Sequence, residues 1–115
     1  MIDLPDFSKA MDYENNFYMS CDSTRISKII AHYELYKMTM EIPGVIMECR
    51  IFKGTSLARF AMFRELFENA SSRKIIGFDV FGKFPDMNYE EDKKVISSLF
   101  LDAAGKTGVS ENQMR

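Results

Sequence analysis

Cysteine is scarce in this 115-residue chain, and long apolar runs are missing from it. The two cysteines, Cys21 and Cys49, fit neither a disulfide framework nor a metal-binding motif. No apolar run reaches the roughly 18 residues that a membrane-spanning helix needs. The acidic N-terminus lacks the basic-then-apolar pattern of a signal peptide. We therefore expect a cytoplasmic protein with reduced thiols and no membrane partner.

A strong excess of one charge is also missing, because 15 Lys and Arg stand against 17 Asp and Glu and give a formal net charge of −2. Residues 1–22 carry five acids and one base, 23–84 six acids and ten bases, and 85–115 six acids and four bases. The basic excess in the middle is too diffuse for a nucleic-acid stripe. Nucleic acid is therefore not an expected partner.

What the chain has in quantity is core material, with 46% apolar residues that include ten Phe and nine Met, beside 28% charged residues. This balance is ordinary for a globular protein, and the length allows one domain at most. Residues 1–22 show no steady period and are predicted to form a mostly irregular N-terminal arm. Residues 23–115 form the domain portion that follows.

The stretch 45–79 organises the chain. Its two apolar runs, 45–49 and 74–78, predict two parallel strands that are buried on both faces. Gly54 marks the turn after the first run and precedes a helix whose broad apolar face extends to Phe67. The stretch therefore predicts a strand, a crossover helix and a second strand.

Further helices are predicted before and after this stretch. Asp22 is a good N-cap residue for a helix over about 23–40, in which apolar side chains recur near helical spacing. Acids at 90–92 suit the start of another helix, which Gly105 ends. Ser110 can cap another helix, but the sequence stops five residues later.

Only two strands are visible, and two parallel strands do not form a stable open sheet alone. The predicted fold is therefore α/β, the incomplete front part of a doubly wound, Rossmann-like, three-layer α/β/α domain. Either the chain is a fragment of a larger domain, or a partner chain supplies the missing layer. That partner chain can be a second copy of the same protein, which would make a homo-oligomer.

An acid follows each strand, and ligands of open α/β sheets bind beyond the carboxyl ends of the strands. Asp79 is placed to accept both hydroxyls of a ribose, and Glu48 to hold an ammonium group of the same ligand. Gly54 and Ser56 begin a helix whose N–H groups point at such a ligand. The alternative is that both acids only cap strand ends in water. The chain lacks Gly-x-Gly-x-x-Gly, which argues against an NAD-type oxidoreductase.

Two blocks of this sequence form a joint pattern. They are Glu48-Cys49-Arg50-Ile51-Phe52-Lys53-Gly54-Thr55-Ser56-Leu57 and Gly77-Phe78-Asp79-Val80-Phe81-Gly82-Lys83-Phe84-Pro85. Together they resemble the macrocin O-methyltransferase family, whose pattern is Glu-Cys-Gly-Val-(Phe/Trp)-(Lys/Arg)-Gly-x-Ser-Leu, followed by Gly-Phe-Asp-x-Phe-x-x-Phe/Leu-Pro. The resemblance covers about residues 14–105.

The resemblance implies a class I methyltransferase fold that binds S-adenosylmethionine and, with help from Mg²⁺, methylates a hydroxyl of a sugar or glycoside. Glu48, Gly54 and Ser56 would line the methionine end of the cofactor. Asp79 would take the ribose hydroxyls, and Phe81 would lie near the adenosine. The metal ligands and the catalytic base of the family lie in a later half that this sequence does not contain. The expectation is therefore a methyltransferase or its cofactor-binding fragment.

Arg50 departs from the family pattern, which has glycine at this position. Glycine there lets the cofactor pass close to the backbone. An arginine side chain can fill that space, or its guanidinium can pair with the cofactor's carboxylate. Steric interference is the expected outcome. This departure and the unpartnered strands favour a second hypothesis, a non-catalytic α/β interaction module that completes its sheet with a partner chain.

Two further residues have ordinary explanations. Cys49 neighbours Glu48 and is expected on the opposite face as a small buried core residue rather than a nucleophile. His32 is the only histidine, and on its predicted helix a structural or surface role is expected.

Overall fold

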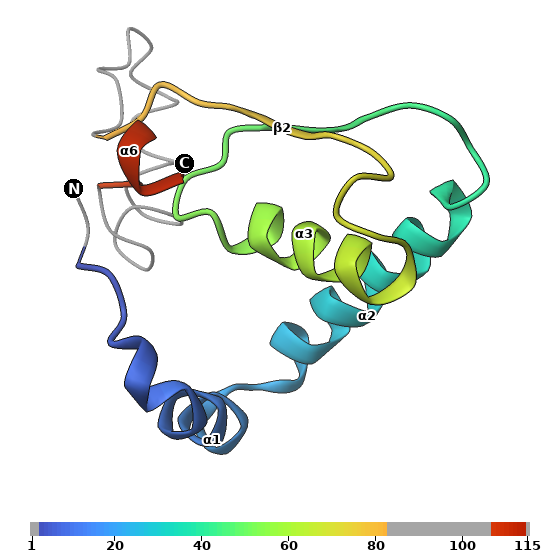
Figure 1. The fold of residues 1–115 in the computed structure, drawn as a ribbon. Helices are drawn as coiled ribbons and strands as arrows, with labels where there is room; N and C mark the ends of the chain where they lie inside the picture. Colours follow the sequence, from blue (N-terminus) through green and yellow to red (C-terminus); the bar gives the residue numbers. More distant parts are fainter. Residues whose placement is uncertain (1–2, 83–106, 115) are drawn as a thin grey trace, which may run out of the picture. The chain divides into compact units, whose positions relative to one another are not determined.

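The computed structural model describes residues 3–82 and 107–114, which form a mixed α/β arrangement (Figure 1). None of the described helices combines the length and the apolar character that crossing a lipid bilayer requires. The elements in chain order are η1 (Phe7–Lys9), α1 (Ala10–Ser20), α2 (Ser23–Thr39), β1 (Ile46–Cys49), α3 (Thr55–Phe67), β2 (Ile75–Phe78) and α6 (Glu111–Met114).

The described residues fall into two compact units. The sheet unit contains residues 47–58, 75–82 and 107–114, and the helical unit contains 3–46 and 59–74. Each unit has its own well-buried side chains, Ile51 and Val109 in the first and Tyr36 in the second.

β1 and β2 pair with each other, as the sequence predicts. The backbone N–H of Ile46 donates to the carbonyl of Lys74 at 3.0 Å, and that of Arg50 donates to the carbonyl of Phe78 at 2.7 Å. Donors and acceptors advance along the chain together, which is the register of parallel strands. The parallel pair brings the carboxyl ends of both strands to the same edge of the sheet.

The prediction that both strands are buried on both faces is wrong. In β1 the half-buried residues Ile46 and Glu48 alternate with the exposed residues Met47 and Cys49. In β2 only Phe78 is exposed, and the three residues before it are half-buried. The alternation in β1 is typical of a strand with one covered face. Cys49 does lie opposite Glu48, but on the exposed face rather than in a core.

The helical unit is built on the contact between α2 and α3, which lie side by side (Figure 1). The predicted helix over 23–40 is confirmed, and the carboxylate of Asp22 caps it by accepting the N–H of Thr24 at 2.9 Å. Tyr36 is the most buried side chain of this unit and is 1% exposed. Its ring lies 5.7–6.5 Å, centroid to centroid, from the rings of Phe60, Phe63 and Phe67. Tyr33 extends this cluster, because its ring lies 5.4 Å from that of Phe67.

The prediction of an irregular arm over residues 1–22 is wrong, because η1 and α1 lie within it. Asp6 caps η1 by accepting the N–H of Ser8 at 3.0 Å, and its own N–H donates to the hydroxyl of Tyr13 at 3.0 Å. All residues from 3 to 20 are exposed. Local hydrogen bonds therefore hold these turns, and since no face is buried, the sequence carries no apolar period that predicts them.

Although only five residues follow Ser110, the short helix α6 begins directly after it. The side chain of Gln113 accepts the N–H of Ser110 at 2.9 Å, and the N–H of Gln113 donates to the carbonyl of Ser110 at 3.1 Å. This is the reciprocal half of a capping box. The predicted helix from 90 to 105 lies outside the described residues.

Candidate functional site

All six predicted site residues belong to the sheet unit. Glu48 lies in β1, and Asp79 and Phe81 follow β2, so they share the carboxyl edge of the sheet with the loop 50–54 and the start of α3. The full set is Glu48, Arg50, Gly54, Ser56, Asp79 and Phe81.

Glu48 and Ser56 are brought together at this edge. The hydroxyl of Ser56 donates to Oε1 of Glu48. Oε2 of Glu48 is buried and has no hydrogen-bond partner in the described part of the chain. Because a buried carboxylate oxygen without a partner is costly, this atom favours a donor from outside, and a cationic donor most of all.

Asp79 bonds to the loop that follows β1. Its Oδ2 accepts the N–H of Phe52 at 2.9 Å, and its Oδ1 accepts the N–H of Val80 at 2.8 Å. A carboxylate has about four lone-pair sites. The two backbone bonds therefore fix the direction of the side chain and leave acceptor capacity on both oxygens.

The loop after β1 turns through left-handed backbone positions. Gly54 has φ of 80°, and its carbonyl accepts the N–H of Ala58 at 2.9 Å, so it caps α3 as the predicted turn glycine. Arg50 and Phe52 have φ of 67° and 53°, a conformation that favours glycine. A glycine at position 50, as in the pattern that the sequence resembles, would therefore fit this backbone without strain.

Phe81 lies in the loop after β2, half-buried, with φ of 52°. Gly82 follows it with φ of 95°. The loops after both strands thus turn sharply at the carboxyl edge, which is where the sequence predicts a ligand.

A segment near the C-terminus, which the sequence did not predict as part of the site, joins these two loops. We call residues 107–110 the C-terminal strap. The N–H of Val109 donates to the carbonyl of Phe52 at 2.7 Å. Gly82 donates its N–H to the carbonyl of Val109 at 3.1 Å and accepts the N–H of Gly108 at 2.8 Å. The only sequence signal for this close approach is the glycine at 108.

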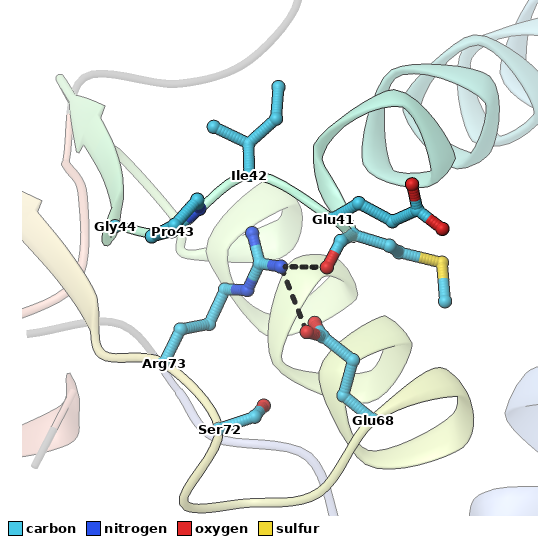
Figure 2. A pocket seen from close by; sticks show the side chains of 8 residues that line it. Glu41, Ile42, Pro43, Gly44, Glu68, Ser72 and Arg73 are labelled. Carbon is cyan, nitrogen blue, oxygen red and sulfur yellow. Dashed lines mark hydrogen bonds and ion pairs between the residues drawn. The ribbon is translucent and has the colours of Figure 1, made fainter.

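The helical unit holds a separate pocket of about 240 Å³ (Figure 2). The guanidinium of Arg73 donates to Oε1 of Glu68 at 2.8 Å and to the carbonyls of Thr39 and Met40 at 3.0 and 3.2 Å. Both charged side chains are largely buried, with 6% of Arg73 and 14% of Glu68 exposed. The lining residues are Met40, Glu41, Ile42, Pro43, Gly44, Glu68, Ser72 and Arg73.

Tyr36 completes this network by donating its hydroxyl to Oε2 of Glu68. That hydrogen bond, followed by the nearby guanidinium of Arg73, holds the pKa of Glu68 below its ordinary value. Burial, followed by the hydrogen bond and charge of Glu68, raises the pKa of Tyr36 to about 12. Arg73 therefore works as a clamp that caps the last carbonyls of α2. We assign this pocket a structural role.

His32 also has a structural environment. Its ring stacks on Phe60 with centroids 4.9 Å apart, and its Nδ1 lies 3.0 Å from Nη1 of Arg59. Since a guanidinium only donates, Nδ1 is the acceptor in this contact. The ring thus contributes to the packing of α2 on α3.

Across residues 3–82 and 107–114, no three His, Cys, Asp or Glu side chains gather in a way that could hold a metal ion. No protein-family model, curated protein or solved structure matches the chain. Its function therefore has to be inferred from the geometry of the site itself.

Proposed function

We propose that the sheet unit is the S-adenosylmethionine-binding part of an O-methyltransferase of the macrocin O-methyltransferase type. The observation that carries this proposal is the pair of acids at one edge of two parallel strands, with Oε2 of Glu48 buried and unpartnered among the described residues. Ligands of open α/β sheets bind at this edge.

Glu48 has the role of holding the ammonium group of the cofactor's methionine end. Ser56 occupies Oε1, so Oε2 is the oxygen left for a charge-assisted hydrogen bond. Gly54 supports the same end, because its left-handed backbone starts α3 without a side chain toward the ligand.

Asp79 has the role of accepting the two ribose hydroxyls. Its backbone bonds to Phe52 and Val80 point the carboxylate in one direction and leave a lone pair on each oxygen. Phe81 lies two residues further on and would line the adenosine side. When bound, S-adenosylmethionine supplies an electrophilic methyl group for transfer to a sugar or glycoside hydroxyl.

No catalytic base or Mg²⁺ ligand is proposed within the described residues. In the family that the sequence resembles, both belong to a later half of the enzyme. The compartment proposed is the cytoplasm, where the free thiols of Cys21 and Cys49 stay reduced.

Calorimetric titration of the full chain with S-adenosylhomocysteine tests the proposal. We expect saturable binding, which Asp79→Ala and Glu48→Gln each weaken by roughly 10- to 100-fold, as expected for lost hydrogen bonds that involve a charged group. Glu65→Gln is the matched control, since it makes the same change on an exposed face of α3 and should bind as the parent does. Equal binding by the parent and both site variants would count against the assigned roles.

A second candidate function is a non-catalytic interaction module. The specific observation in its favour is the exposed apolar face of the sheet, on which Met47 is 62% and Phe78 54% exposed. Among the described residues both strands are also edges of the sheet. A partner chain, including a second copy, would then complete the sheet.

A further inference from the structure

We propose that the C-terminal strap closes the proposed cofactor site and has to lift before a nucleoside-type ligand can bind there. This inference rests on the proposed function, because it concerns the same edge of the sheet. It makes the free protein a mixture of closed and open states, of which only the open state binds.

The strap bonds to both loops that a ligand at this edge would touch. Val109 donates to Phe52, in the loop after β1, and it accepts from Gly82, in the loop after β2. In Figure 1 the red C-terminal segment accordingly lies at the orange end of the β2 trace. The strap therefore crosses from one loop to the other at the carboxyl edge.

No room for a ligand is left between the strap and the first loop. A Cβ placed on Gly108 would lie 2.6 Å from the carbonyl oxygen of Phe52 and 3.1 Å from its carbon. Val109 is 3% exposed. Backbone thus packs directly on backbone, and a nucleoside can enter this space only after the strap has moved.

Phe52 links the strap to Asp79. Its N–H donates to Oδ2 of Asp79, and its carbonyl accepts the N–H of Val109. A ligand that adds hydrogen bonds to Asp79 therefore acts on a carboxylate that is bonded to the same residue as the strap. Binding and strap opening are coupled, and by linkage each must favour the other.

The closed state lowers the apparent affinity by the fraction of molecules that are open. Within residues 3–82 and 107–114, three backbone hydrogen bonds and one buried valine hold the strap, so local opening without global unfolding is expected. A substitution that the closed state cannot accept should shift the population toward the open state.

Gly108→Val in the full chain is the test, because its Cβ meets the Phe52 carbonyl. We expect the amide of Val109 to lose protection from hydrogen exchange and S-adenosylhomocysteine to bind about tenfold more tightly by calorimetry. Asn112→Val is the matched control, since it adds the same side chain at an exposed position of α6 and should change neither measurement.

A second measurement needs no variant. Saturating S-adenosylhomocysteine should speed exchange of the Val109 amide in the parent chain, because a bound ligand keeps the strap open. The strap proposal is wrong if the parent and Gly108→Val bind S-adenosylhomocysteine equally well and the ligand does not change hydrogen exchange of the Val109 amide. That result leaves the proposed function standing. Loss of Val109 protection in Gly108→Val without any detectable binding overturns the proposed function itself, and the strap inference with it.

Discussion

Arg50 is the residue at which local strain and the proposed function meet. Its φ of 67° belongs to the left-handed region, which costs an ordinary L-residue free energy that glycine does not pay. Its side chain is exposed. A glycine at this position would therefore relieve the backbone.

Arg50→Gly should therefore raise the free energy of unfolding by about 0.5–1 kcal/mol, the gain from relieving the left-handed backbone less the added entropy of the unfolded chain. Urea unfolding measures it. Lys53→Gly is the control in the same loop, at an exposed position outside the left-handed set, and should lower the unfolding free energy by a similar amount. A loss in both variants would show that position 50 carries no strain.

At the scale of single residues, the sequence predicted which residues lie at turns and strand ends, but it did not predict hydrogen bonds between residues far apart in the chain. Gly54 and Asp79 were predictable because turns and strand ends have local signals. Arg73 was not, since an arginine in a polar loop looks like a surface residue. Its burial depends on carbonyls at the end of α2, 33 and 34 residues earlier in the chain.

The α2–α3 pair is held by a titratable network as well as by aromatic packing. Tyr36, Glu68 and Arg73 bond in series, and the pKa of Tyr36 is raised to about 12. An unfolded tyrosine titrates near pH 10, to within about one unit. Folding thus favours the neutral phenol, so this contribution is complete below about pH 10 and lost as the pH rises through 12.

The difference in unfolding free energy between the parent and Tyr36→Phe should consequently shrink from about pH 10 to about pH 12. Urea unfolding across this range measures it, because Tyr36→Phe keeps the ring and removes the titrating group. Tyr18→Phe, on the exposed arm, should show no such trend. A parent–Tyr36→Phe difference that stays constant with pH would contradict the assignment.

Elements with a buried face were the ones that the sequence could predict. α2 and α3 follow from apolar residues at helical spacing, and β1 and β2 from apolar runs next to turn residues. α1 has no buried face and, within the described residues, no side-chain cap at its N-terminus, so it has no signal of this kind; the side-chain cap nearby is that of Asp6 on the preceding turn η1. Burial of the strands was overestimated, because an apolar run shows what a strand can bury and not what covers it.

At the scale of the whole molecule, the exposed apolar face of the sheet is the feature that favours a binding partner. Met47 and Phe78 present apolar surface there, and an uncovered apolar edge favours association. The exposed apolar surface supports the interaction-module candidate. It also agrees with the methyltransferase proposal when a second copy of the chain completes the fold.

Sedimentation velocity should therefore show self-association of the parent chain at micromolar concentrations. Met47→Lys should shift it toward the monomer, because a charge on the sheet face has to be desolvated in the contact. Met62→Lys is the matched control, since Met62 on α3 is 61% exposed against 62% for Met47. A parent that is strictly monomeric and folds cooperatively would remove the main support for the module.

The Arg73 clamp has a consequence for the order in which the protein is made. The guanidinium that caps α2 belongs to a residue 34 positions after Thr39. At ordinary translation rates that interval is roughly 2–7 s. A nascent chain on the ribosome therefore carries this helix without the arginine on the carbonyls of Thr39 and Met40, and it gains that cap only when Arg73 emerges.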